Sequence, residues 1–140
     1  MPKGSVDARR AIIDADILIE IIDRNIAEKL SLLFSTIYVP MAVKGQLKKH
    51  RKRYNLKRLL ATGIFKKCTV HDEYSVQSLQ QEPPKLDPGE SHAIIQAQEK
   101  NISVFLTNER KARKVAQRYG LLVITFRELE QALQELASQH

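Results

Sequence analysis

The stretch from residue 90 to residue 124, ESHAIIQAQEKNISVFLTNERKARKVAQRYGLLVI, decides the expected fold. Residues 102–106 and 121–124 are short apolar runs that predict buried strands. Residues 90–101 and 109–119 carry the apolar spacing of helices. Because strands that alternate with helices form crossover units, the stretch predicts parallel strands in an α/β fold.

The same alternation continues on both sides of this stretch. Strands are expected at residues 11–13, 36–39 and 65–70, the last as an edge strand. Helices are expected at residues 17–22, 26–34, 41–61 with an interruption near 54–55, 74–81 and 126–137. We therefore predict a three-layer α/β/α sandwich whose central sheet is mostly parallel and has about four or five strands.

The length and composition exclude several classes of protein. The chain has 140 residues, 43% of them hydrophobic, which favours a single globular domain over residues 1–140 and excludes an intrinsically disordered chain. Its one cysteine, Cys68, cannot form an internal disulfide. No apolar run approaches the length of a membrane span or a signal peptide, so we expect a cytoplasmic protein that does not insert into membranes.

The positive charge of the chain is concentrated. Lys and Arg number 23 against 16 Asp and Glu, a formal charge of +7. Residues 29–71 contain 11 Lys or Arg and no acid, so the rest of the chain is net acidic. Such a run is either a solvated helix face or a surface that contacts phosphates, and we expect the second. The expected nucleic-acid-binding residues are Lys48, Lys49, Arg51, Lys52 and Arg53, together with Arg110, Lys111, Arg113 and Lys114 of the basic helix.

Acidic residues lie at predicted strand ends. Asp14 and Asp16 follow the strand at residues 11–13, and Glu109 follows the strand at residues 102–106. Glu90 opens the helix that leads into that second strand. Functional sites in parallel α/β sheets gather outside the carboxyl ends of the strands. Because unpaired carboxylates repel one another, this arrangement favours a site for a hard divalent cation, Mg²⁺ or Mn²⁺.

A second interpretation needs no cation. Asp87 and Glu90, with Pro88 between them, form the pattern of a capping box at a helix start. Thr107 can cap the next helix, and Asp14 or Asp16 can cap the helix after the first strand. Capping explains each acid alone, but it does not explain why acid-bearing helix starts meet at one sheet edge.

Three segments together resemble the PIN domain family of nucleases, which includes the toxins of VapBC-type toxin–antitoxin modules. They are AIIDADILIEII (residues 11–22), IYVPMAVKGQL (residues 37–47) and PGESHAIIQAQEKNISVFLTNERKARKVAQRYGLLVI (residues 88–124). The resemblance covers roughly residues 10–125. It implies a PIN-like fold and a metal-dependent endoribonuclease that hydrolyses RNA phosphodiester bonds. It also implies an antitoxin partner and a homodimer.

The resemblance assigns roles to individual residues. Asp14, Glu90 and Glu109 match the family's acids, which implies that they are the catalytic residues and the ligands of Mg²⁺ or Mn²⁺. Asp16 matches a position that supports the site, and we expect Thr107 and Asn108 beside Glu109 to support it as well.

At two positions the sequence departs from the family pattern. Gln46 stands where the family usually has Glu, and Glu109 stands where it usually has Asp. The loss of one negative charge at Gln46 leaves open a second function, a PIN fold that binds RNA or a protein with little or no cleavage. A receiver-like signalling domain also gathers acids at strand ends. It is disfavoured because Thr125 and Phe126, not a lysine, follow the last predicted strand.

Overall fold

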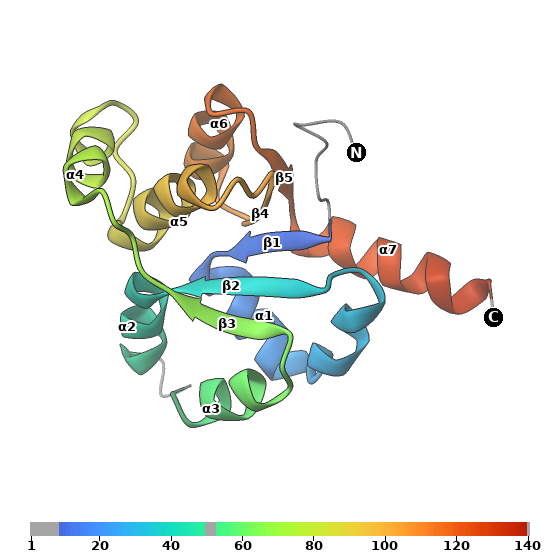
Figure 1. The fold of residues 1–140 in the computed structure, drawn as a ribbon. Coiled ribbons are helices and arrows are strands. Elements are labelled where there is room, and N and C mark those ends of the chain that lie inside the picture. The colour runs from blue at the N-terminus through green and yellow to red at the C-terminus, as the bar shows by residue number, and fades with distance from the viewer. Residues whose placement is uncertain (1–8, 50–52, 140) are drawn as a thin grey trace.

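The central sheet is five-stranded and every neighbouring pair of strands is parallel (Figure 1). The structure, a computed structural model, describes residues 9–49 and 53–139. The strand order across the sheet is β3-β2-β1-β4-β5. The strands are β1 Arg10–Ile13, β2 Thr36–Pro40, β3 Phe65–Cys68, β4 Val104–Leu106 and β5 Leu122–Ile124. The predicted α/β class with a parallel sheet is confirmed.

Helices cover both faces of the sheet and complete the predicted three layers (Figure 1). On one face lie α1 (Ala15–Arg24), the 3₁₀ helix η1 (Ala27–Leu32), α2 (Met41–Lys49), α3 (Arg53–Ala61) and α7 (Phe126–Ser138). On the other face lie α4 (Glu73–Gln81), α5 (Pro88–Glu99) and α6 (Arg110–Arg118). Over residues 9–49 and 53–139, no helix is long and apolar enough to cross a membrane.

The alternation of side chains along β1 explains why both faces need a cover. Ala11 and Ile13 pack into the core under α1 and α7, whereas Ile12 packs into the core under α5 and α6. All three residues are fully buried. A central strand of a parallel sheet is buried on both faces, which is why its sequence is continuously apolar up to Asp14.

Two of the expected helices differ in detail from those observed. Residues 26–34 were expected to form an α-helix, but η1 is a 3₁₀ helix in which Ala27 and Leu30 face the core. Residues three apart eclipse in a 3₁₀ helix, so the same apolar spacing satisfies either form. The helix expected over residues 41–61 is interrupted, but the interruption was placed too late: α2 ends at Lys49 and α3 begins at Arg53, so residues 54–55 lie inside α3.

The strand order places a crevice beside β1. The chain proceeds from β1 outward to β2 and β3, and then returns to the other side of β1 for β4 and β5. At such a switch point, the loops that follow the two neighbouring strands lead to opposite sides and leave a crevice between them. Ligands of open α/β sheets bind in that crevice. The backbone N–H of Asp14 donates to the carbonyl of Leu106 (2.9 Å), so β1 and β4 remain paired up to the crevice.

Candidate functional site

Asp14 lies at the centre of the crevice and is held by both of its carboxylate oxygens. It is the residue before α1, and its Oδ1 accepts the backbone N–H of Ala15 at 2.8 Å. Its Oδ2 accepts the hydroxyl of Thr107 at 2.8 Å. Asp14 is 3% exposed and Thr107 is fully buried. The capping interpretation of Asp14 is therefore correct, and the two hydrogen bonds fix its carboxylate within the crevice.

Thr107 and Asn108 join the loop after β4 to the neighbouring helix starts. The Thr107 hydroxyl that donates to Asp14 also accepts the backbone N–H of Glu109 (3.1 Å). The backbone N–H of Asn108 donates to Asp16 Oδ2 (3.1 Å), and Asn108 Oδ1 accepts the N–H of Phe126 (2.9 Å). These bonds fix the starts of α1, α6 and α7 relative to one another.

The start of α5 lies across the crevice. Asp87 and Glu90 form the expected capping box: Glu90 Oε1 accepts the N–H of Asp87 (2.9 Å), and Asp87 Oδ1 accepts the N–H of Glu90 (2.7 Å). Glu90 is only 5% exposed. Its carboxylate is thus directed back onto its own helix, although it remains near enough to Asp14 to raise the pKa of Asp14.

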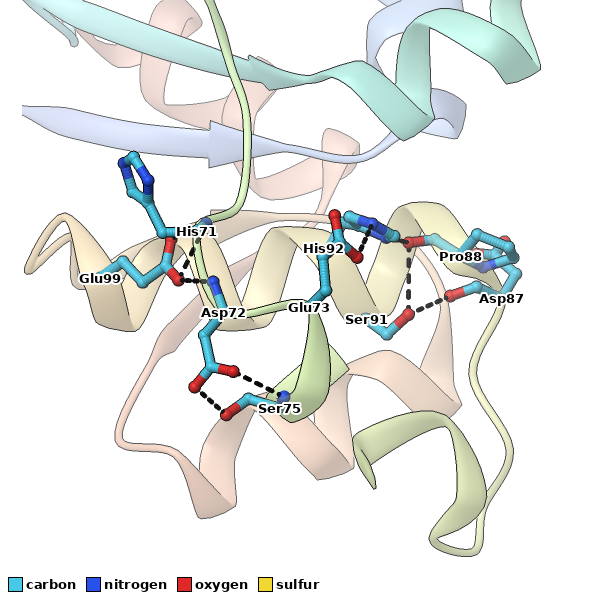
Figure 2. A network of polar contacts seen from close by, with 9 residues as sticks. All are labelled: His71, Asp72, Glu73, Ser75, Asp87, Pro88, Ser91, His92 and Glu99. Atoms are coloured by element: carbon cyan, nitrogen blue, oxygen red, sulfur yellow. Dashed lines mark hydrogen bonds and ion pairs between the residues drawn. The ribbon is translucent and has the colours of Figure 1, made fainter. Parts of the chain in front are cut away.

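The first turn of α5 is also braced on its other side (Figure 2). The Ser91 hydroxyl donates to the carbonyl of Asp87 (2.9 Å). The Nδ1 atom of His92 lies 2.6 Å from the carbonyl oxygen of Pro88, and because that oxygen can only accept, Nδ1 carries the proton. The Nε2 atom of His92 lies 3.7 Å from the carboxylate of Glu73 on α4.

Gln46 reaches the crevice from α2 and contacts the start of α5. Its Nε2 donates to Asp87 Oδ2 at 3.1 Å, and its Oε1 is buried with no hydrogen-bond partner among the described residues. Gly89 makes this approach possible, since a Cβ atom at position 89 would collide with that Oε1 atom. The amide of Gln46 therefore donates a hydrogen bond to Asp87, whereas a carboxylate at position 46 would repel it.

These residues surround one open cavity of about 450 Å³. It is lined by Asp14, Ala15, Asp16, Ile19, Gln46, Asp87 and Glu109. None of these lining residues, all within the described ranges, is a lysine, arginine or histidine. We call this cavity the acidic pocket. Of the three acids predicted as metal ligands, Asp14 and Glu109 line the pocket, whereas Glu90 is hydrogen-bonded to the neighbouring Asp87 and is not a lining residue.

The carboxyl groups of the acidic pocket are difficult to ionise together. Burial, and next the charge of Asp16, raises the pKa of Asp14 to about 8. Burial likewise raises the pKa of Glu90 to about 7 and raises the pKa of Asp16. A carboxyl group removed from water and set among other acids keeps its proton unless a positive charge compensates it.

The donor set fits a hard divalent cation. Asp14, Asp16 and Glu109 offer carboxylate oxygens, and the unpartnered Gln46 Oε1 faces the same region. Such cations select oxygen ligands, and a cation would supply the positive charge that the pocket lacks. Within residues 9–49 and 53–139, no three Asp, Glu, His or Cys side chains are already grouped closely enough to hold a metal ion, so its binding would require side-chain rotations.

The predicted basic residues fall in two groups. Arg110, Lys111, Arg113 and Lys114 lie on α6, all are exposed, and the helix begins directly after Glu109. Lys48 and Lys49 lie in α2 and Arg53 opens α3, but the placement of their side chains is not described. Arg51 and Lys52 lie outside the described residues. Among the basic side chains that the structure describes, the α6 group lies on the helix that begins at the acidic pocket.

Comparison with known proteins identifies the family. The model of the PIN domain family matches residues 10–126 of this chain. The chain belongs to the PIN domain family. No curated protein matches it in sequence.

Solved structures share the fold of this PIN domain. A PilT N-terminus domain protein from the archaeon Sulfolobus solfataricus P2 is similar over 89% of this chain and 92% of its own, with a TM-score of 0.61 and 16% identity. A toxin–antitoxin complex from Klebsiella pneumoniae contains a chain similar over 83% of this chain and 97% of its own, with a TM-score of 0.60 and 18% identity. At these identities the similarity is one of fold.

Two residues of the PIN domain's acidic pocket were not expected from the sequence. Asp87 was recognised only as a helix cap, yet it lines the pocket and holds Gln46. Ile19 gives the pocket an apolar wall beside the acids. The capping-box pattern locates Asp87 at a helix start, but the approach of α2 to α5 that makes it part of the site is a tertiary contact.

Proposed function

We propose that this PIN domain is a metal-dependent endoribonuclease that hydrolyses RNA phosphodiester bonds. The observation that carries the proposal is the acidic pocket, where carboxylates from the ends of two adjacent parallel strands face one cavity with no cationic side chain in its lining. The raised pKa values of Asp14 and Asp16 support a compensating cation there.

The ligands that we propose for Mg²⁺ or Mn²⁺ are Asp14, Glu90 and Glu109, with Asp16 as a further carboxylate in the pocket. When bound, the cation would supply the Lewis-acid chemistry that phosphodiester hydrolysis needs, activating water and offsetting the charge of the phosphate. Thr107 and the N–H of Ala15 fix the two oxygens of Asp14. Glu109 already lines the pocket, and its side chain is exposed and makes no capping hydrogen bond, so it can rotate toward a cation near Asp14.

Other parts of the chain would bind and orient the RNA. Helix α6 begins directly after Glu109, which lines the pocket, and a helix N-terminus attracts phosphate. Arg110, Lys111, Arg113 and Lys114 would add sequence-independent contacts to neighbouring phosphates. The apolar wall at Ile19 offers a surface against which a base or ribose can pack.

The first test is a cleavage assay with purified protein and unstructured RNA. We expect cleavage with Mn²⁺ or Mg²⁺, none with EDTA, and about 100-fold slower cleavage by Glu109→Gln because that variant loses a proposed ligand. Gln117→Glu, an exposed change on the same helix, serves as the control and should cleave normally. RNA binding without cleavage under every metal condition would contradict the nuclease.

A second function, a PIN fold that binds RNA or a protein with little cleavage, is favoured by a specific contact. Gln46 donates to Asp87 instead of presenting a carboxylate, and Glu90 is engaged in its capping box. The same cleavage assay separates the two functions.

We further propose that the chain is the toxin of a toxin–antitoxin module, acting in the cytoplasm as a homodimer and held inactive by a small antitoxin protein. The fold similarity to a chain of a toxin–antitoxin complex supports this proposal. Induced expression of the wild type should arrest bacterial growth, and Glu109→Gln should not, when the two accumulate equally. If the wild type and Glu109→Gln both arrest growth, toxicity does not depend on the acidic pocket.

A further inference from the structure

Two cations are held over one aromatic ring at the end of the sheet away from the acidic pocket. The guanidinium carbon of Arg10 lies 5.5 Å from the ring centroid of Tyr38, and the Nζ atom of Lys100 lies 4.9 Å from it. Arg10 also donates to the backbone carbonyl of Lys100 at 3.3 Å. The first residue of β1, the middle of β2 and the residue after α5 therefore converge on this ring.

A third cation stands beside the same ring. Lys66 on β3 is the register partner of Tyr38 on β2, so the two side chains project from the same face of the sheet about 5 Å apart. Lys66 is exposed, and β3 is an edge strand. We refer to Arg10, Lys66 and Lys100 around Tyr38 as the distal basic cluster.

Within residues 9–49 and 53–139, the distal basic cluster lacks an acidic partner. Among the described residues, none of its three cations forms an ion pair with a carboxylate. The acid next to Lys100 in sequence is Glu99, and its carboxylate accepts the backbone N–H groups of His71 and Asp72 at 2.8–3.1 Å (Figure 2). Cations gathered without a counter-charge repel one another, and a bound anion would relieve that repulsion.

Helix α5 connects the acidic pocket to the distal basic cluster. The N-cap of helix α5, Asp87, lines the pocket, and its C-cap is Lys100 of the cluster. Its 12 residues span about 18 Å, a distance covered by about five phosphates of a stacked strand. A single strand with one phosphate in the pocket therefore reaches the cluster with a phosphate about five nucleotides away.

We propose that the distal basic cluster binds phosphate groups of the RNA strand whose scissile phosphate lies in the acidic pocket. The assignment of the pocket rests on the proposed function, but the cluster itself is an independent feature of the fold. Tyr38 holds two of the cations in place through its ring, so less side-chain freedom is lost on binding. Phosphate contacts of this kind add affinity without reading sequence.

The experiment measures RNA binding in the Asp14→Asn background, which keeps the RNA intact. The probes are single-stranded oligouridylates of about 20 and about four nucleotides, the shorter being too short to connect pocket and cluster. For the longer RNA, we expect Lys66→Glu to weaken binding and to reduce the slope of log K against log salt by about 0.7. For the shorter RNA, we expect no change.

Matched variants separate the cluster from a general charge effect. Lys29→Glu makes the same charge change on η1, on the opposite face of the sheet, and should leave both RNAs unaffected. Tyr38→Phe keeps the ring and should bind as the parent does, whereas Tyr38→Leu should weaken binding of the longer RNA.

Several results would overturn the proposal. It fails if the two oligonucleotides respond equally to Lys66→Glu, if Lys29→Glu has the same effect, or if the parent binds neither RNA. It also fails if polyglutamate displaces the longer RNA from the parent but not from Lys66→Glu, because the cluster would then recognise an acidic protein segment. If the wild type binds RNA through the cluster but cleaves none, the proposed nuclease activity is contradicted and the proposal for the cluster is supported.

Discussion

Asp14→Asn is expected to reduce metal-dependent RNA cleavage by about 100-fold or more while making the cation-free protein more stable at pH 8. The change removes a negative charge from a site that is 3% exposed. The asparagine side chain has the shape of the protonated acid, so it can still accept the N–H of Ala15 and pair with the hydroxyl of Thr107. Loss of activity with gain of stability distinguishes a functional acid from a structural one.

The stability gain has a defined pH dependence. Burial raises the pKa of Asp14 from an ordinary 3.8 to about 8. Between those values the folded chain binds a proton that the unfolded chain has released, so this group's contribution is fully present at low pH and is lost as pH rises toward 8. In EDTA, the free energy of unfolding of the wild type should fall between pH 5 and pH 8 more steeply than that of Asp14→Asn.

Urea unfolding at several pH values, in EDTA and in Mn²⁺, measures both effects. Mn²⁺ at about 100 times its dissociation constant should stabilise the wild type by about 2.7 kcal/mol and Asp14→Asn by much less. Glu28→Gln, an exposed change on η1, should behave as the wild type in every condition. Equal pH slopes for wild type and Asp14→Asn would show that the buried carboxyl does not titrate as inferred.

Gln46→Glu is expected to destabilise the cation-free protein and to strengthen divalent-cation binding. The two side chains have the same size, so the close approach to Gly89 is preserved. The donor that Gln46 presents to Asp87 Oδ2 is lost, and two carboxylates then face each other at a former hydrogen-bond distance of 3.1 Å. Loss of that bond and the new repulsion should lower the unfolding free energy in EDTA by about 1–3 kcal/mol.

The same variant tests whether Gln46 limits catalysis. If the missing carboxylate weakens cation binding, Gln46→Glu should raise the cleavage rate at low Mn²⁺ by about 10-fold. Gln77→Glu on α4, exposed and away from the pocket, controls for net charge. An unchanged rate together with an unchanged response of the melting temperature to Mn²⁺ would mean that position 46 does not contact the cation.

Much of the fold follows from local pattern, and the exceptions have local causes. The apolar runs at 102–106 and 121–124 contain the observed strands β4 and β5 because a buried parallel strand must be apolar on both faces. The 3₁₀ form of η1 could not be predicted, since Ala27 and Leu30 face the core in either helical form. The break between α2 and α3 was misplaced because residues 48–53 are all basic, so no apolar side chain marks where one helix ends and the next begins.

The acidic pocket could be predicted only in part. Placement of Asp14 and Glu109 at adjacent strand ends follows from parallel topology, which the sequence indicates. The contact of Gln46 with Asp87 joins residues 41 positions apart and depends on the packing of α2 against the start of α5. No local pattern contains that contact. The capping-box pattern, in contrast, predicted both the position of Glu90 and the bond of its carboxylate to the backbone N–H of Asp87.

The lysines of β3 have a consequence for self-association. An edge strand offers unpaired N–H and C=O groups to any other strand, and charged side chains along it discourage such pairing. Lys66 and Lys67 lie at the middle of β3, project to opposite faces and are both exposed. A neutral, β-branched replacement at either position would leave an apolar edge open to another copy of the sheet, so reversal of the charge is the safer substitution there.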